Sequence, residues 1–334
     1  RRTAGNICVF SCGLFLIMIE SNQTNVLPEK TSRISSGQLM RRTYPGTAAA
    51  WLARQKEREV TMDKEQFAAI VKDAFAGVGN QVLLPQENVT VPIMDAPIYG
   101  FAAADDPLFD TFRDPEIIGE KWMSPKEWMP EAKTVAVFYF SFSEEIRSRH
   151  RASNEPIDEA WVNGYGNHAK VVVPFARAVT AALEKEGIKV FNPTWDMDHP
   201  SVSIPVDNGG EEDLHWSVAW STRHVAYVAG LGTFGVHRHI ITEKGCCGAM
   251  VTLLLDCAME PTKRPYTDPY EYCTRCGTCT TRCPVDAISL EHLRNLKKCS
   301  GRSGELFKIY KKGNCGKCMV GVPCEDRIPV KADQ

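Results

Sequence analysis

The spacing of apolar residues along residues 62–261 predicts alternating helices and strands. Segment 62–79 carries apolar residues at 67, 70, 71, 74 and 75, a spacing typical of an amphipathic helix. The unbroken apolar run at 133–142 predicts a buried strand, because a strand covered on both faces needs no polar positions. Segment 158–187 has a long helical pattern that ends at Gly187, a residue suited to a helix C-cap.

Shorter patterns continue this alternation toward the cysteine-rich end of the chain. Segment 188–193 predicts a strand, 217–229 a helix, and 237–242 and 249–256 two further strands. The proline-rich segment 82–110 contains short β-prone pieces and predicts a surface segment or edge strands. The whole pattern is typical of a mixed α+β or α/β domain over residues 62–261, in which helices pack on a sheet.

Residues 1–61 differ in character from this domain. An apolar run at 7–19 follows Arg1 and Arg2, and it is shorter than the roughly 20 residues that span a bilayer. A signal-peptide core is one interpretation of this run. The following polar, turn-rich segment 30–46 favours a poorly ordered N-terminal extension, or residues that precede the true start of the protein. We therefore expect no membrane span.

The composition is that of an ordinary globular protein. Hydrophobic residues make up 43% of the chain and charged residues 24%, and the net charge of −2 gives no general reason to expect binding to DNA or to a membrane surface. Most of the 13 cysteines lie after Gly245, unlike the even scatter of a small secreted disulfide scaffold. A reducing, cytoplasmic location is the one we predict.

The spacing of the cysteines indicates iron-sulfur chemistry. The segment 273–284 reads C-x2-C-x2-C-x3-C-P, the pattern of bacterial ferredoxins, in which the fourth cysteine serves a neighbouring cluster. Four later cysteines can complete two [4Fe-4S] clusters. The division that uses all eight places one cluster on Cys273, Cys276, Cys279 and Cys324, and a second on Cys283, Cys299, Cys315 and Cys318.

Structural zinc is the alternative to these clusters. Zinc sites usually use separated C-x2-C pairs, and three thiols within seven residues fit one zinc ion poorly. We therefore predict a ferredoxin-like domain with two clusters over residues 262–334. Cys246, Cys247 and Cys257 are interpreted as small buried residues, the usual role of a free cysteine.

Basic residues outnumber acidic ones between Glu291 and Lys317. This run is either a solvated face or a docking patch for an acidic electron donor or for phosphates. Reduced ferredoxin or flavodoxin is the electron donor that we expect.

A glycine loop at 230-GLGTFG-235 matches the pattern G-x-G-x-x-G. In a dinucleotide-binding fold this loop leaves a strand and enters a helix, whose N-terminus meets the pyrophosphate. Here a helical pattern precedes the loop and an extended segment follows it. The glycines therefore predict a helix C-cap, or a close approach of the backbone to a flat ligand.

The order of these features resembles a known family. The segment HVAYVAGLGTFGVHRHIITEKGCCGAMVTLLLD is followed by YCTRCGTCTTRCPVDAIS, by a lone cysteine in KKCSGR and by CGKC with a last cysteine. Over about residues 90–324 this order is similar to the epoxyqueuosine reductase family and the related reductive dehalogenases. From this resemblance we expect a short form of the family, without the C-terminal helical repeats that help some members bind tRNA.

The resemblance implies a corrinoid such as cobalamin, held against the α/β domain, and two [4Fe-4S] clusters that supply electrons to reduce a substrate. The loop with Gly230, Gly232 and Gly235, and the turn at Gly245, would lie beside the corrinoid. We expect Tyr165 and His168 to line the same pocket. The substrate would be tRNA or a small molecule.

The proton donor is harder to assign. The resemblance implies that tRNA-modifying members have a proton-donating aspartate at the position that Trp216 occupies in this sequence. Asp213 and His215 lie just before that position. Asp213, His215 and Tyr227 are the candidates we retain, with His224 as a further one.

The sequence therefore favours an iron-sulfur reductase that resembles epoxyqueuosine reductase. The alternative is a ferredoxin-like electron-transfer protein or subunit without corrinoid chemistry of its own. A nicotinamide or flavin enzyme that uses the clusters as a relay is a third interpretation. A deep pocket formed by Tyr165, His168 and the 230–235 loop would favour the reductase.

Overall fold

The computed structural model describes residues 62–153, 157–196, 198–312 and 314–330. The N-terminal extension predicted for residues 1–61 lies outside them. Within the described ranges, no helix has both the length and the apolar character that a membrane span requires.

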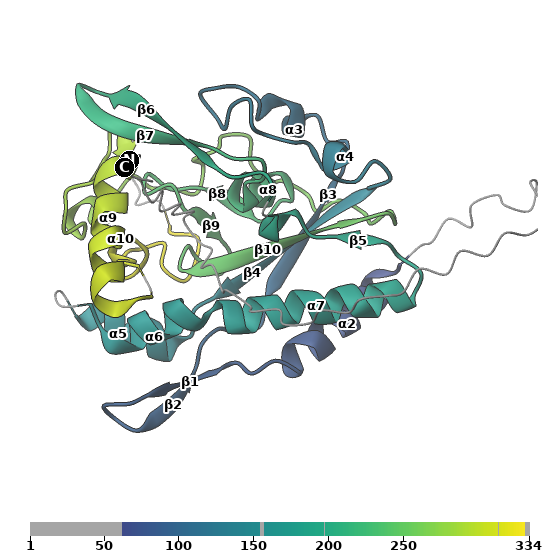
Figure 1. Cartoon of the computed structure of the whole chain (residues 1–334), viewed down its shortest axis with the longest axis horizontal. Helices are drawn as coiled ribbons and strands as arrows, with labels where there is room; N and C mark the ends of the chain where they lie inside the picture. Colours follow the sequence, from purple (N-terminus) through teal and green to yellow (C-terminus); the bar gives the residue numbers. More distant parts are fainter. Residues whose placement is uncertain (1–61, 154–156, 197, 313, 331–334) are drawn as a thin grey trace, which may run out of the picture. The chain divides into compact units, whose positions relative to one another are not determined.

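A four-stranded sheet forms the centre of the described chain (Figure 1). Its order is β3-β4-β10-β5, with β3 at Ile98–Ala103, β4 at Thr134–Ser141, β10 at Gly248–Leu255 and β5 at Val190–Phe191. All three neighbouring pairs are antiparallel. The mixed helix-and-strand fold predicted from the sequence is confirmed, and β3 takes the edge position expected for segment 82–110.

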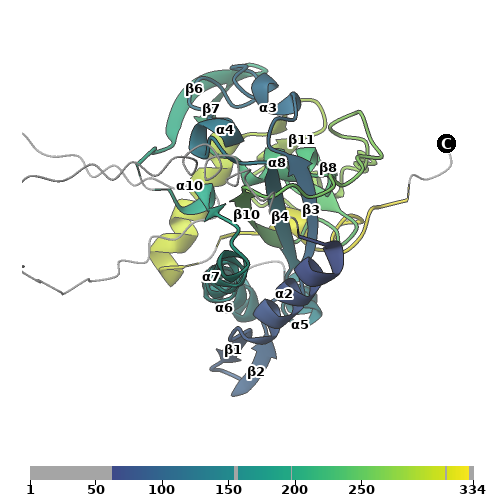
Figure 2. The same cartoon turned by 90° about the vertical axis from the view of Figure 1, so that its right-hand side faces the viewer.

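Strand β4 is buried along its whole length, as its apolar run predicted. Phe138 and Phe140 point into one core cluster, whereas Val137 and Tyr139 point into another. The first cluster contains residues of α2 (Lys64–Ala76) and α7 (Ala169–Lys185), and the second contains those of α8 (Thr222–Val228). Figures 1 and 2 show α2 and α7 on one side of the sheet and α8 on the other.

The long helix predicted at 158–187 is two helices, α6 (Glu159–Asn167) and α7, which meet at His168. Gly164 lies where α5 (Glu144–Ala152) packs closely, because a side chain there would overlap Ile146. Glycine weakens a helix by roughly 1 kcal/mol relative to alanine. The apolar spacing was therefore read correctly, but it did not reveal the break at His168.

The remaining strands form antiparallel hairpins. They are β1 (Gln81–Leu84) with β2 (Val89–Pro92), β6 (Val202–Asn208) with β7 (Glu211–Ser217), β8 (Gly232–Phe234) with β9 (Ile240–Thr242), and β11 (Ile288–Ser289) with β12 (Leu293–Arg294). The β6–β7 hairpin was not predicted. Strand β6 is almost entirely exposed and contains Pro205, so its sequence lacks the usual pattern of a half-buried strand.

Several short helices and one longer helix complete the described fold. The short ones are α3 (Leu108–Thr111), α4 (Pro125–Trp128), α9 (Thr278–Thr281) and the 3-10 turns η1 (Pro193–Trp195) and η2 (Lys317–Met319). The longer one, α10 (Leu296–Tyr310), begins after Asn295, whose side chain accepts a hydrogen bond from the Lys298 N–H at 2.9 Å. Only Leu306 of α10 is fully buried, which explains why its helical pattern was missed.

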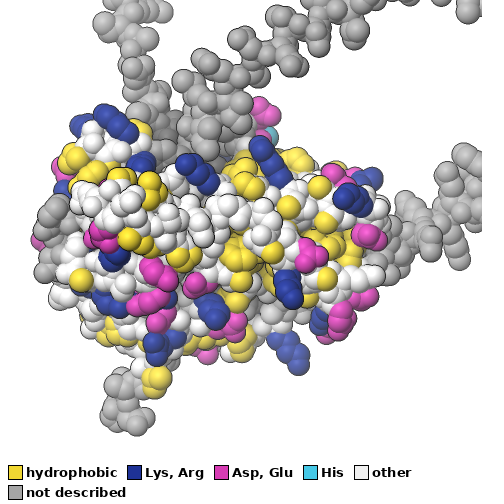
Figure 3. Space-filling view, turned by 90° about the horizontal axis from the view of Figure 1, so that it is seen from below, with side chains coloured by type: hydrophobic (Ala, Val, Ile, Leu, Met, Phe, Trp, Pro, Cys, Tyr) yellow, Lys and Arg dark blue, Asp and Glu magenta, His cyan; other side chains and the backbone are white. Residues whose placement is uncertain are grey.

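The described surface shows mixed charge on the face nearest α2 and α7. Figure 3 views the molecule from below Figure 1, and basic and acidic side chains are interspersed there among apolar ones. This mixture agrees with the small net charge of −2. Among the described residues, that face offers no extended single-sign field of the kind that attracts nucleic acid.

A partly buried histidine on α8 predicts how stability depends on pH. Burial, with further contributions from Arg223 and His215, lowers the pKa of His224 to about 3, from an ordinary value of 6.5. As pH falls below 6.5, the unfolded chain gains a proton that the folded chain excludes, so stability is lost between pH 6.5 and 3. Between pH 6.5 and 5.5, we expect the wild type to lose about 1 kcal/mol more than His224→Gln. Urea unfolding at both pH values measures this, and equal losses would contradict it.

Candidate metal centre

Four cysteines line one cavity in the C-terminal part of the chain. They are the four predicted for the first cluster, Cys273, Cys276, Cys279 and Cys324, and His237, Val236, Ile241 and Val322 line the same cavity. Cys279 lies on α9, which follows Gly277 in a left-handed conformation with φ of 76°. The glycine allows the sharp turn that points the three nearby sulfurs toward one space.

The fourth cysteine is carried into this cavity by backbone pairing with a distant segment. The Cys246 N–H donates to the Cys324 carbonyl at 2.8 Å, and the Cys247 N–H donates to the Glu325 carbonyl at 3.2 Å. Gly245 has φ of 74°, and a side chain there would overlap the backbone of Glu325. Gly245, which was expected to lie beside a corrinoid, therefore has a structural reason to be glycine.

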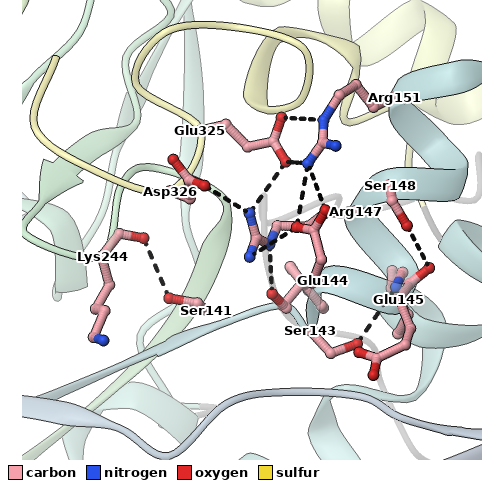
Figure 4. Close-up of polar contacts among 12 residues, drawn as sticks. Ser141, Ser143, Glu144, Glu145, Arg147, Ser148, Arg151, Lys244, Glu325 and Asp326 are labelled. Carbon is pink, nitrogen blue, oxygen red and sulfur yellow. Dashed lines mark hydrogen bonds and ion pairs between the residues drawn. The ribbon is translucent and has the colours of Figure 1, made fainter.

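A buried ion-pair network fixes the residue that follows Cys324. Its members are Glu325 and the two α5 arginines Arg147 and Arg151, and we call it the Glu325 network (Figure 4). The Glu325 carboxylate accepts hydrogen bonds from Arg147 at 3.2 Å, from Arg151 at 2.6 Å and from the Gly321 N–H at 2.7 Å. Burial acts to raise the pKa of Glu325, but Arg151 and the Gly321 N–H outweigh it and hold that pKa below its usual value.

The cysteines predicted for the second cluster influence one another electrostatically. Burial, with contributions from Cys299 and Cys283, raises the pKa of Cys315 to about 11. Burial likewise raises the pKa of Cys318, and the thiols of Cys299, Cys315 and Cys279 add to the effect. Because Cys279 belongs to the first set and α9 packs on η2, the two cysteine sets are adjacent.

The CGKC segment of the second set is fixed on α5 and α6. Lys317 is buried and donates to the His150 carbonyl at 3.0 Å and to the Ser153 hydroxyl at 3.2 Å. The Trp161 indole N–H donates to the Asn314 carbonyl at 2.9 Å. These bonds hold the backbone that carries Cys315 and Cys318 in one position.

The chemistry of the thiols fits a metal cluster. Burial raises the pKa of Cys279 to about 12, and the neighbouring thiols Cys324, Cys273 and Cys276 raise it further. Such crowding disfavours four thiolates in the absence of a cation, whereas bound iron stabilises thiolates and removes the conflict. Each set offers four thiols, the donor type and number that a [4Fe-4S] cluster uses, and those of the first set line one cavity.

A smaller donor group overlaps with the first set. His237, Cys246 and Cys324 are all buried, and one ligand atom from each lies within 4.8 Å of the others. A single metal ion is the alternative occupant of these three residues. Cys324 belongs to both groups, so a four-sulfur cluster and this three-residue site exclude each other.

The predicted proton donors have mainly structural contacts. Asp213 is buried, and its carboxylate accepts from the Lys297 N–H at 3.0 Å and from the Asn208 amide at 3.1 Å, which fastens β7 to the start of α10. The His215 Nε2 lies 3.1 Å from the Ile118 carbonyl. The Tyr227 hydroxyl donates to the Thr267 carbonyl at 3.2 Å from a largely exposed position.

The glycine loop runs from α8 into the β8–β9 hairpin, so the order of elements predicted around it is confirmed. Side chains at Gly230 and Gly232 would come too close to the backbones of Lys263 and Ile241 respectively. A side chain at Gly235 would crowd the ring of His237. Backbone and ring packing therefore account for all three glycines.

Tyr165 and His168 lie apart from this loop. Their rings pack on Phe142, with centroids 5.6 and 6.3 Å away, on the α7 side of the sheet. Leu231 and Phe234 of the loop belong to the cluster on the α8 side. Tyr165 and these two loop residues therefore pack in different core clusters, and their role beside a corrinoid stays a prediction.

The basic run of residues 291–317 is largely compensated. Lys297 pairs with Glu212, and Lys298 pairs with Glu211 at 2.7 Å. Two further members of the run, Arg294 and Lys317, are buried. These contacts favour the interpretation as an ordinary solvated face over a strong docking patch.

Comparison with known proteins identifies the class of the C-terminal part. Residues 267–289 match the family model described as a 4Fe-4S binding domain. This range contains Cys273, Cys276, Cys279 and Cys283, so the chain contains an iron-sulfur domain of this class. A comparison with curated proteins finds no match.

Solved structures with a similar fold come from two families. Epoxyqueuosine reductase from Streptococcus thermophilus is 17% identical with a TM-score of 0.47, over 81% of this chain and 68% of that one. The Bacillus subtilis epoxyqueuosine reductase is 18% identical with a TM-score of 0.46, over 80% of this chain and 66% of that one. A catabolic reductive dehalogenase in complex with 3-bromo-4-hydroxybenzoic acid is 14% identical with a TM-score of 0.45, over 70% of this chain and 30% of that one.

These are the two families that the motif order resembles. The chain spans about two thirds of the length of the epoxyqueuosine reductases and less than a third of the dehalogenase. At these identities and TM-scores, the likeness supports no conclusion about activity, substrate or cofactor.

The Glu325 network gives a prediction for stability. Replacing Arg147 with Met leaves the buried Glu325 carboxylate short of a partner, and removal of one member of a buried pair costs about 3 kcal/mol. The matched control is Lys189→Met, which breaks the exposed pair with Glu131 and is expected to cost less than about 1 kcal/mol. Urea unfolding of the two variants measures the difference. Equal losses would show that the Glu325 network does not stabilise the fold.

Proposed function

We propose that the chain is an iron-sulfur oxidoreductase that holds two [4Fe-4S] clusters and uses them to deliver electrons to a reductive site. The observation that carries this proposal is the convergence of Cys273, Cys276, Cys279 and Cys324 on one cavity. The first three are close in sequence, but Cys324 reaches the cavity only through its pairing with residues 246 and 247. Random scatter of cysteines would not produce this arrangement.

The ligands would be the two predicted sets. Cys273, Cys276, Cys279 and Cys324 would hold one cluster, and Cys283, Cys299, Cys315 and Cys318 the other. Clusters of this type supply one-electron transfer at potentials set by burial and by hydrogen bonds to their sulfurs. The chain contributes apolar walls from Val236, Ile241 and Val322, which limit water at the first set.

The position of the two sets suggests a direction for electron transfer. Cys276 of the first set is exposed, whereas the four cysteines of the second set are each partly buried. An external donor would therefore approach the first set at Cys276, and reduced ferredoxin or flavodoxin remains the predicted donor. Cys279 and Cys318 bring the two sets together, which favours transfer between them.

The activity that the motif order implies is that of an epoxyqueuosine reductase. One solved epoxyqueuosine reductase was crystallised with an epoxyqueuosine-modified tRNA stem loop, which makes this the first substrate to test. Of the proposed proton donors, Tyr227 is the one with a largely exposed hydroxyl, and burial of the ring raises its pKa so that it keeps its proton. Asp213 and His215 are already used in bonds between elements.

A second candidate function is supported by the placement of Tyr165 and His168. Tyr165 packs against the core cluster on the α7 side of the sheet, whereas Leu231 and Phe234 of the glycine loop belong to the cluster on the α8 side. We therefore derive no step through a corrinoid. This disagreement favours a ferredoxin-like electron-transfer protein whose substrate site lies on a partner.

Substitution of single cysteines tests the proposal. Protein purified anaerobically in the presence of cobalamin should contain about eight irons and eight sulfides per chain. Cys276→Ala and Cys299→Ala should each lose about four irons, because each removes a ligand of a different cluster. Cys257→Ala is the matched control, since Cys257 is buried away from both sets, and it should keep all the iron.

Four results separate the alternatives. Zinc in place of iron would refute the proposal. Unchanged iron content in Cys299→Ala would refute the proposed second cluster. Reduction of epoxyqueuosine in the tRNA stem loop with retained cobalt would establish the reductase. Full iron content without cobalt or reduction would favour the electron-transfer protein.

A further inference from the structure

A buried histidine lies against the sulfur of Cys324. His237 follows the glycine loop and is only 1% exposed. Its Nε2 atom lies 3.4 Å from the Cys324 Sγ, and its ring forms part of the wall of the first cysteine cavity. Cys324, the proposed ligand most distant in sequence from the other three, therefore has an imidazole beside its sulfur.

The backbone decides which nitrogen of His237 carries the proton. The His239 N–H donates to the Nδ1 atom of His237 at 3.1 Å. A nitrogen that accepts a hydrogen bond has no proton, so the single proton of the neutral imidazole lies on Nε2. His237 thus presents an N–H donor to the Cys324 sulfur.

The local turn holds the ring in this position. The Gly235 N–H donates to the His239 carbonyl at 2.9 Å, and the Arg238 N–H donates to the Gly235 carbonyl at 2.7 Å. Arg238 adopts φ of 58°, a left-handed conformation that is unfavourable for a residue other than glycine. A side chain at position 235 would lie 2.6 Å from the His237 ring. The left-handed conformation of Arg238 and the absence of a side chain at Gly235 together hold the imidazole of His237 in one position.

A second side chain adjoins the same sulfur. The Cys246 Sγ lies 3.8 Å from the Cys324 Sγ and is completely buried. Its backbone N–H already donates to the Cys324 carbonyl. Cys246 can therefore give a weaker S–H hydrogen bond to the sulfur that His237 contacts.

We propose that His237, assisted by Cys246, donates a hydrogen bond to the Cys324 sulfur and thereby raises the reduction potential of the first cluster. The inference rests on the proposed function, because it requires a cluster on the first cysteine set. A donor beside a ligand sulfur stabilises negative charge, and the reduced cluster carries one more negative charge than the oxidised one. His237 is thus a positioning and tuning residue that does not bind iron.

The test compares His237→Phe with the wild type in a redox titration followed by EPR. Phenylalanine fills a similar space but has no N–H donor. We expect iron content to stay at the wild-type level and the first cluster to become harder to reduce. The equilibrium constant for its reduction should fall about tenfold, which is about 59 mV for one electron.

Two further variants make the comparison specific. His237→Gln retains a side-chain N–H and should recover part of the lost potential. Thr278→Val is the matched control, because it removes a hydroxyl that lies 3.4 Å from the exposed sulfur of Cys276. Water can replace that hydroxyl, so the potential should change less than in His237→Phe.

A measurement on the unaltered protein covers the case in which His237→Phe does not fold. Pulsed EPR of wild-type protein labelled with 15N-histidine should show a weak nitrogen coupling to the reduced first cluster, as expected for a hydrogen-bonded imidazole. A strong coupling typical of an iron-bound nitrogen, or no coupling, would overturn the inference. Two results from a folded His237→Phe variant would also overturn the inference: an unchanged reduction potential of the first cluster, or the loss of about four irons. Wild-type protein without iron would instead refute the proposed function.

Discussion

The pairing of residues 245–247 with residues 324–326 is the constraint on which the metal centre depends. It brings Cys324 to three cysteines that are far from it in the sequence. Strand β10 begins directly after this pairing, at Gly248, so the central sheet sets the position of the cluster ligand. The Glu325 network adds an attachment to α5 (Figure 4). A change in the packing of the sheet would therefore move a ligand of the cluster.

The same arrangement links the two proposed clusters to the α/β core. Arg147 and Arg151 of helix α5 bind the carboxylate of Glu325, which follows the first-set residue Cys324. The Nε2 atom of His150, also on α5, contacts the carbonyl of Cys315 in the second set. Burial, followed by Lys317, lowers the pKa of His150 to about 3, so its ring stays neutral beside that lysine. One helix thus supports both sites. Each site is built on rigid elements, which suits electron transfer because little rearrangement accompanies a change of charge.

The sequence predicted the features whose chemistry or burial leaves a local pattern. Strand β4 was found because burial on both faces leaves an unbroken apolar run, and the cysteines were found because cluster geometry dictates their spacing. Helix α10 was missed because Leu306 is its one buried residue, and the β6–β7 hairpin was missed because β6 is almost entirely exposed. The contacts of Glu325 with Arg147 and of His237 with Cys324 join residues far apart in the chain, and no local pattern marks them. The glycines of the loop were recognised, but only the structure shows that protein atoms lie against them.

The most direct test of this account is a crystal structure of the anaerobically purified protein, with iron located by anomalous scattering. The account predicts one [4Fe-4S] cluster bound to the sulfurs of Cys273, Cys276, Cys279 and Cys324, with the Nε2 atom of His237 beside the Cys324 sulfur and not bonded to iron. A cluster ligated by Cys246 or His237 in place of Cys324 would contradict it. A single metal ion on His237, Cys246 and Cys324 would contradict it as well.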